Sequence, residues 1–227
     1  MAIDLDLCTA CGGCVVACAS ENNLPIPVDT SDGAGTGISW MELVAQREGA
    51  EGVVSETAPM PCMHCEDPPC TKVCPVGATY ANEEGLVIQV WDRCIGCRYC
   101  TAACPYSRRY YNWSKPEFPD DLRNLLNPDV ATRPEGVVEK CTFCVHRLRK
   151  TKETVIREGR TLTDADVVRL PACAQSCPAH AITFGDLADP ESRVARAAAS
   201  PRASRLLEHL GTKPKVYYLS TDRRSSS

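Results

Sequence analysis

Residues 94–105 read CIGCRYCTAACP, which places four cysteines in the spacing Cys-x2-Cys-x2-Cys-x3-Cys and a proline directly after the fourth. Residues 8–18 repeat the spacing without the proline. The chain has 227 residues and 16 cysteines, and every cysteine belongs to a group of four. The groups are Cys8, Cys11, Cys14 and Cys18 (group one); Cys62, Cys65, Cys70 and Cys74 (group two); Cys94, Cys97, Cys100 and Cys104 (group three); and Cys141, Cys144, Cys173 and Cys177 (group four).

This spacing suits the coordination of a 4Fe-4S cluster. Three cysteines in Cys-x2-Cys-x2-Cys wrap a tight loop around three irons, and glycines such as Gly12 and Gly96 ease the turns of that loop. The Cys-x3-Cys step carries the fourth thiolate one helical turn onward, where it faces a second cluster. No cysteine is left over, so the sequence predicts four 4Fe-4S clusters.

Two other kinds of chemistry also use cysteines at short spacings. A Cys-x2-Cys pair can form a disulfide, but disulfide frameworks are typical of small secreted chains, and residues 1–8 show no signal peptide. Structural zinc takes four ligands, often as two Cys-x2-Cys pairs, whereas groups one and three each hold a third cysteine at the same short spacing. A zinc-stabilised interaction module is therefore the alternative from a different class.

Clusters of this type come in pairs, so the cysteine groups must pair too. Groups two and three are separated only by a short segment with a strand-like pattern at residues 85–90, which favours one compact two-cluster unit. Groups one and four then pair across the chain, although a pairing of one with two and of three with four stays open. The preferred pairing predicts four ligand sets: Cys8, Cys11, Cys14 and Cys177 (cluster one); Cys18, Cys141, Cys144 and Cys173 (cluster two); Cys62, Cys65, Cys70 and Cys104 (cluster three); and Cys74, Cys94, Cys97 and Cys100 (cluster four).

The preferred pairing also predicts the fold class and the domain organisation. We expect an α+β protein with two bacterial-ferredoxin-like modules of two 4Fe-4S clusters each, the second inserted into the first, with extended loops. The expected parts are residues 1–45 plus 136–190 (module one), 52–112 (module two), 113–135 (a loop) and 191–227 (a C-terminal extension).

Hydrophobic patterning adds local predictions. Residues 3–7 alternate apolar and acidic side chains, which indicates a half-buried strand. Residues 145–158 predict a basic helix. Residues 191–210 predict a helix interrupted at a proline, and residues 216–219 predict a closing strand.

Composition argues against several function classes. A net charge of -4 and a pI near 5.6 argue against a nucleic-acid binder, which usually has a strongly basic face. No run of about 18 apolar residues exists, so we expect no direct membrane span. The sequence has no nucleophile–base constellation, Walker loop or GxGxxG motif, so we expect no catalytic residues.

Several segments resemble a known family in detail. The matching segments are residues 62–70 (CMHCEDPPC), 74–80 (CPVGATY), 94–100 (CIGCRYC) and 139–144 (EKCTFC). Over about residues 1–190, the chain resembles the four-cluster iron–sulfur subunit of complex iron–sulfur molybdoenzymes. The polysulfide reductase, dimethyl sulfoxide reductase, sulfite dehydrogenase and tetrathionate reductase subunits are similar, as is the equivalent module of alternative complex III. The resemblance supports the pairing of group one with group four.

The resemblance implies a non-catalytic electron-transfer role. It implies two partners, a large molybdopterin-type catalytic subunit with molybdenum or tungsten and an integral membrane quinone-binding anchor subunit. The chain would then be peripheral and membrane-associated through these partners. The resemblance also implies the order of the clusters: the chain of clusters extends from group one, nearest the catalytic subunit, through group four to groups three and two, near the anchor. The rival partners are those of a membrane-bound nickel–iron hydrogenase or of alternative complex III.

Some residues near the cysteines are candidates for tuning the clusters. Arg93 and Arg98 flank group three and Lys140 precedes group four, so their charges could raise cluster potentials. The plainer interpretation of each is a solvated or packing cation. His64 lies between two ligands of group two and is expected to pack rather than to bind iron.

Overall fold

The computed structural model describes residues 1–25, 37–48 and 53–221. The helices are α1 (Gly13–Glu21), α2 (Pro69–Lys72), α3 (Tyr99–Ala103), α4 (Asp120–Arg123), α5 (Val145–Arg157), α6 (Asp164–Val167), α7 (Ala172–Gln175) and α8 (Arg193–Ala198). The strands are β1 (Ala2–Asp4), β2 (Glu42–Glu48), β3 (Val53–Met60), β4 (Thr79–Ala81), β5 (Val87–Gln89), β6 (Tyr110–Tyr111), β7 (Val138–Glu139), β8 (Ile182–Thr183), β9 (Ala203–Ser204) and β10 (Tyr217–Leu219). These short elements make the α+β class that the sequence predicts. Parts of the expected module one (26–36) and C-terminal extension (222–227) lie outside the described residues.

The largest sheet joins the two ends of the described chain. Its strand order is β8-β1-β10-β9. β1 runs parallel to β10, with Ile3 opposite Tyr218, and antiparallel to β8, with Ile3 opposite Ile182. The strand expected at residues 216–219 is confirmed as β10, whereas the strand expected at residues 3–7 spans only Ala2–Asp4, because residues 5–7 form a turn.

Two small hairpins connect the cysteine groups. β4 and β5 form a hairpin between groups two and three, with Tyr80 opposite Ile88. β6 pairs with β7, so the segment just after group three is hydrogen-bonded to the segment just before group four. The second hairpin therefore joins the end of the expected module two to module one.

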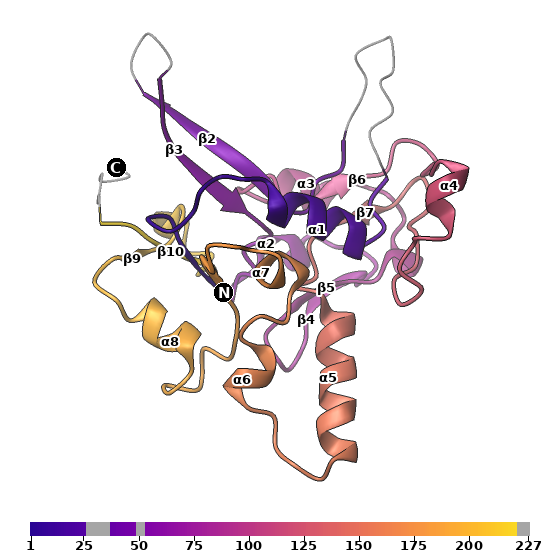
Figure 1. Cartoon of the computed structure of the whole chain (residues 1–227). Helices are drawn as coiled ribbons and strands as arrows, with labels where there is room; N and C mark the ends of the chain where they lie inside the picture. The colour runs from indigo at the N-terminus through magenta and orange to yellow at the C-terminus, as the bar shows by residue number, and fades with distance from the viewer. Residues whose placement is uncertain (26–36, 49–52, 222–227) are drawn as a thin grey trace.

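A longer hairpin, β2–β3, has no counterpart in the sequence predictions. Its strands pair antiparallel from Glu42 opposite Met60 outward, with an irregularity after Gln46. In Figure 1 the hairpin projects from the body of the molecule at the upper left. The expected boundary between module one (ending at residue 45) and module two (beginning at residue 52) falls inside this hairpin.

Two pairs of packed short helices carry one or two cysteines of each group. α1 packs against α7, and these carry Cys18 and Cys173. α2 packs against α3, and these carry Cys70 and Cys100. Helix packing thus brings group one to group four, and group two to group three.

α5 is the basic helix expected at residues 145–158, and it extends from the lower end of the molecule in Figure 1. The helix expected at 191–210 is wrong in extent. α8 ends at Ala198, and residues 203–204 form β9, which pairs with β10. Sheet pairing outweighs the helical propensity of this alanine-rich segment because propensity is a weak preference that tertiary context overrides.

The C-terminal extension packs on the group-two loop. Glu66 N–H donates to the Lys213 carbonyl (2.9 Å), and Lys215 N–H donates to the Met63 carbonyl (3.0 Å). The extension is therefore part of the wall around the cysteines. In the described residues, no helix has both the length and the apolar character needed to cross a bilayer.

Candidate iron–sulfur cluster sites

The ligand set predicted for cluster one lines a single small cavity. Cys8, Cys11 and Cys14 come from the loop before α1 and its first turn, and Cys177 comes from the turn after α7. Burial raises the pKa of Cys14 to about 11, and the neighbouring thiolates Cys8 and Cys177 add to the increase. The structure thus brings together thiols from the first and last cysteine groups.

The set predicted for cluster two is the most deeply buried. Burial raises the pKa of Cys18 well above its ordinary value, and the thiolates of its set add to the effect: Cys141, Cys173 and Cys144. The Asn22 side chain donates from Nδ2 to the Cys18 Sγ at 3.7 Å and to the Cys18 carbonyl at 2.9 Å. The fourth cysteine of group one therefore faces group four, as the Cys-x3-Cys spacing predicts.

The set predicted for cluster three is gathered around α2. Burial raises the pKa of Cys65 to about 12, and the thiolates of the same set, Cys62, Cys70 and Cys104, contribute to the increase. Thr212 of the C-terminal extension forms a hydrogen bond with Cys65 that works against this increase. Residues from three separate stretches of chain thus meet at one site.

The set predicted for cluster four is partly exposed, as set one is. Burial raises the pKa of Cys100, and Cys94 is among the thiolates that add to it. The Cys74 Sγ accepts the Ala78 N–H at 3.2 Å. Cys97 is exposed. Cys74 and Cys97 belong to this set by the sequence pattern, since the contacts within the set join only Cys94 to Cys100 in the described residues.

The cysteine loops turn their backbone N–H groups toward sulfur. The donors are Gly96 and Val138 to the Cys94 Sγ (both 3.4 Å), Phe143 to the Cys141 Sγ (3.5 Å) and Ala181 to the Cys177 Sγ (3.3 Å). Left-handed residues make these turns, including Gly96 (φ 69) and Arg98 (φ 59). Such donors stabilise thiolate charge, which is the protein environment that an iron–sulfur cluster needs.

The chemistry of the donors fits iron–sulfur clusters. Soft thiolates are the ligands of such clusters, and all 16 cysteines carry free thiols.

Electrostatic influences link thiols of different predicted sets. Burial is the main cause of the raised pKa of Cys173, Cys141 and Cys100, and a thiolate of another set adds to each. That thiolate is Cys14 for Cys173, Cys62 for Cys141 and Cys70 for Cys100.

His64, which directly precedes Cys65 of set three, forms a hydrogen bond with the backbone of Cys141 of set two. It is fully buried, and its ring stacks on Phe143 with centroids 3.8 Å apart. The Val87 N–H donates to its Nδ1 (3.1 Å), so its Nε2 carries the proton toward the Cys141 carbonyl (3.0 Å). Burial, followed by the charge of Lys140, lowers the pKa of His64 well below its ordinary value. His64 is therefore a neutral packing residue, as expected from the sequence.

The cations named from the sequence occupy different environments. Arg93 and Arg98 are exposed, and the Arg98 guanidinium lies over the Trp113 ring at 4.7 Å. Lys140 is buried, and its Nζ donates to the Cys141 carbonyl at 2.7 Å. Of the three, only Lys140 places its charge inside the protein beside the thiols.

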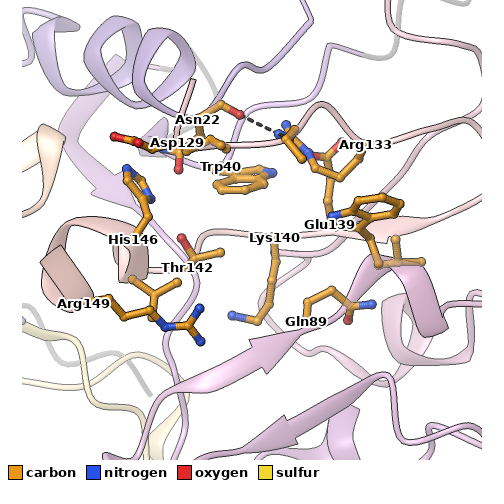
Figure 2. Close-up of a pocket in the computed structure, with 15 residues that line it drawn as sticks. Asn22, Trp40, Gln89, Asp129, Arg133, Glu139, Lys140, Thr142, His146 and Arg149 are labelled. Carbon is orange, nitrogen blue, oxygen red and sulfur yellow. Dashed lines mark hydrogen bonds and ion pairs between the residues drawn. The ribbon is translucent and has the colours of Figure 1, made fainter. Parts of the chain in front are cut away.

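A polar cavity of about 200 Å³ lies beside set two. Figure 2 shows Lys140 and Arg149 ending in this cavity, with His146 on its far side. Arg133 closes its edge by donating to the Asn22 carbonyl at 2.7 Å, and forms a buried ion pair with Glu139 at 2.6 Å. This network holds the end of the 113–135 loop against α1.

Sequence reasoning missed two residues that act on thiols. Asn22 donates to Cys18, and the charge of the buried Arg109 side chain favours the thiolate forms of Cys70 and Cys100. Both residues follow the last cysteine of a Cys-x2-Cys-x2-Cys-x3-Cys run at a short distance. A polar residue four or five positions after that cysteine is the signal from which they could have been found.

Sets of thiols that each combine two cysteine runs define a ferredoxin-type iron–sulfur protein. In agreement, a 4Fe-4S dicluster domain matches residues 53–119. Relatives match nearly the whole chain. The iron–sulfur cluster-binding subunit of menaquinone reductase from Nitratidesulfovibrio vulgaris is 49% identical over 97% of this chain and 88% of its own. The iron–sulfur subunit of arsenate respiratory reductase from a Shewanella species is 35% identical (96% and 94%), and a polysulfide reductase chain from Wolinella succinogenes is 34% identical (97% and 93%).

The protein belongs to the family of iron–sulfur electron-transfer subunits of complex iron–sulfur molybdoenzymes. Its relatives are iron–sulfur subunits of reductase complexes and not their catalytic subunits. The expectation of a non-catalytic electron-transfer protein is therefore confirmed.

Proposed function

We propose that the chain holds four 4Fe-4S clusters and carries electrons between a molybdenum- or tungsten-pterin catalytic subunit and a quinone-reactive membrane subunit. The observation that carries this proposal is that thiols of groups one and four lie together, as do thiols of groups two and three. In the proposed arrangement the sets form a single file in the order one, two, three, four. When bound, such clusters accept and release single electrons. The ligands would be the four predicted sets, beginning with Cys8, Cys11, Cys14 and Cys177 and ending with Cys74, Cys94, Cys97 and Cys100.

The chain's own contribution is to hold, bury and charge-balance these sites. Burial keeps water from the middle sets, and the backbone donors to Cys94, Cys141 and Cys177 fix the thiolates in place. Fixed cations near the thiols, such as Lys140, offset the negative charge that each cluster adds.

Exposure at both ends of the file supports two docking partners. Cys11 of set one and Cys97 of set four are exposed. Exposed apolar side chains lie near these cysteines in the sequence. Val16 follows Cys11, and Ile95 and Tyr99 flank Cys97. An exposed ligand with apolar neighbours is suited to a subunit interface across which electrons pass. We assign the set-one end to the catalytic subunit and the set-four end to the membrane subunit.

Metal analysis of the complex purified anaerobically on this subunit tests the proposal. We expect about 16 iron atoms and as many sulfides per chain, from four clusters of four irons, together with molybdenum or tungsten. Nickel in place of these metals would assign the chain to a hydrogenase. A colourless protein with zinc and no iron would contradict the proposal and identify a zinc-stabilised interaction module.

One comparison favours a second arrangement. The relative at 49% identity is named for a menaquinone reductase. In that arrangement the main reaction of the complex is electron transfer to or from quinone, as in alternative complex III. Such a complex would contain neither a molybdenum nor a tungsten pterin. Iron at about 16 atoms per chain with c-type haem and neither molybdenum nor tungsten would select it.

A further inference from the structure

The two cysteine runs of identical spacing are followed by different buried residues. Cys18 is followed four and five residues later by Asn22 and Asn23, and Cys104 is followed at the same offsets by Arg108 and Arg109. All four of these side chains are buried. Equivalent positions in the two modules therefore carry neutral amides in one and guanidinium groups in the other.

Arg109 is held among module-two elements by polar partners. Its Nη1 donates to the Gln89 Oε1 at 2.8 Å, and its Nη2 donates to the Thr79 Oγ1 at 2.6 Å. These partners lie on the two strands of the β4–β5 hairpin. Both are uncharged, so they orient the guanidinium without neutralising it.

The thiols of two neighbouring sets complete the surroundings of Arg109. Its Thr79 partner follows Ala78, whose N–H donates to the Cys74 Sγ of set four at 3.2 Å. The Arg109 charge acts on the thiols of Cys70 in set three and Cys100 in set four. Burial raises the pKa of both thiols, and the Arg109 charge is the next largest influence and opposes that increase. Only 6% of Arg109 is exposed, so water screens its charge weakly.

In module one, Asn23 stands at the offset of Arg109 and donates to the Asn127 carbonyl at 2.9 Å, and the buried residue that meets a thiol is Asn22, at the offset of Arg108. The Asn22 amide donates to the Cys18 Sγ at 3.7 Å and brings a dipole but no net charge. A guanidinium is charged at every physiological pH. A fixed cation stabilises the reduced, more negative state of a nearby cluster and therefore raises its midpoint potential.

We propose that Arg109 is a positioning residue whose charge raises the midpoint potentials of clusters three and four together. Both clusters of module two are then easier to reduce than they would be with their thiol ligands alone. This inference rests on the proposed function, because it requires clusters bound to Cys70 and Cys100. Its physical basis is one buried charge between two sites.

A merely structural role for Arg109, as a clamp on the β4–β5 hairpin, makes a different prediction. A clamp would affect stability and iron content and leave the potentials of loaded clusters unchanged. Arg109→Gln removes the charge but keeps an amide donor, and Arg109→Lys keeps the charge but loses the planar fork. Arg98→Gln is the matched control, because Arg98 is an exposed arginine in the same module.

The test is a redox titration of the purified complex followed by electron paramagnetic resonance, with iron content measured on each sample. In fully loaded Arg109→Gln we expect two of four midpoint potentials to fall, and to fall further than any potential in Arg98→Gln. Arg109→Lys should retain most of the wild-type values. Unchanged potentials in loaded Arg109→Gln, or an equal shift of all four, would overturn the inference.

A second variant covers the case in which Arg109→Gln fails to load iron. Thr79→Val keeps the cation and removes one of its anchors. A shift confined to two potentials in this variant supports the inference, and no shift overturns it. The wild-type titration separates the two proposals: fewer than four clusters contradicts the proposed function, whereas four clusters with an insensitive Arg109 contradicts only this inference.

Discussion

Two separate constraints require a glycine at position 96. Its φ is 69, and a Cβ at this position would lie 2.2 Å from the Gly136 carbonyl oxygen. Gly12 has a similar φ of 78 in the group-one loop, but a Cβ there would meet nothing within 4 Å. The two glycines therefore separate the cost of backbone conformation from the cost of a clash.

We predict that Gly96→Ala lowers stability and iron content much more than Gly12→Ala. The left-handed conformation costs an alanine about 1–2 kcal/mol at either position, and only Gly96→Ala adds a clash with backbone. Thermal unfolding and iron analysis of the purified complex measure both effects. Equal losses in the two variants would show that the Gly136 contact has no energetic weight.

Glu21 links α1 to α5 and gives the protein a pH dependence. It accepts hydrogen bonds from Arg147 Nε and His146 Nε2, at 2.6 and 2.7 Å. Burial alone would raise the pKa of Glu21, but these bonds outweigh it and lower that pKa below its ordinary value. A lowered folded-state pKa means that the stabilisation is present at neutral pH and is lost as the pH falls through that value.

We predict that Glu21→Gln costs about 1–2 kcal/mol near neutral pH, because it removes charge-assisted hydrogen bonds. The variant should also lose less stability than the wild type between about pH 7 and about pH 3. Denaturant unfolding at both pH values gives the comparison. If the free energies of unfolding of the variant and the wild type fell in parallel as the pH is lowered, the pKa of Glu21 would be the same in the folded and unfolded chains.

At the residue scale, the sequence predicts the thiols better than their surroundings. The spacing of Cys18 predicts that it faces group four, because one helical turn separates it from Cys14. The role of Arg109 could not be predicted, because its burial depends on Thr79 and Gln89, and their hairpin partners are set by long-range packing. Spacing encodes local geometry, whereas the environment of a buried charge is a property of the tertiary fold.

Among the elements, α6 has the clearest local signal. Thr163 and Asp166 form a capping box, and Arg160 makes two 2.9 Å bonds to the Asp166 carboxylate. The Arg160 hydrogen bond is the largest of several contacts that lower the pKa of Asp166. The helix leads into the segment that carries Cys173. Directly after the helix, the Val168 carbonyl accepts the Phe184 N–H.

We predict that Thr163→Ala lowers the free energy of unfolding by about 1 kcal/mol, because the helix loses its N-cap. Thr161→Ala, an exposed threonine outside the helix, should leave stability within about 0.5 kcal/mol of the wild type. Denaturant unfolding of the purified complex measures both. A loss of the same size in the Thr161 variant would remove the capping box as the cause.

At the scale of elements, prediction succeeds where one segment carries the whole signal. α5 is predicted because its polar and apolar residues repeat at helical spacing within a single stretch. The β2–β3 hairpin and β9 escape prediction because each depends on a partner strand. The helix expected at 191–210 fails for the same reason, since β10 supplies a partner that propensity does not foresee.

For the whole molecule, the thiol sets connect iron content to folding. Burial and neighbouring thiolates raise the pKa of Cys18 and Cys173 well above the ordinary thiol value. Without metal these thiols stay protonated at neutral pH. Metal binding must release those protons, so it contributes directly to the free energy of folding.

We predict that the iron-free chain, prepared with a chelator under reducing conditions, loses its cooperative unfolding transition, and that reconstitution with iron and sulfide restores it. Circular dichroism during heating, beside the visible absorbance of the clusters, follows both states. An iron-free chain that unfolds with the wild-type midpoint would show that the polypeptide alone determines the fold.

The pairing of β1 with β10 also bears on biosynthesis. Translation proceeds from the amino end, so all the thiols proposed for clusters three and four have been synthesised once residue 104 is added. The thiols of group one must wait for Cys173 and Cys177, and β1 has no parallel neighbour until residues 217–219 arrive. Maturation would then begin in the middle of the polypeptide and reach its oldest residues last. During that interval the earliest cysteines are reactive and unprotected, so the cell must keep them reduced until translation is nearly complete.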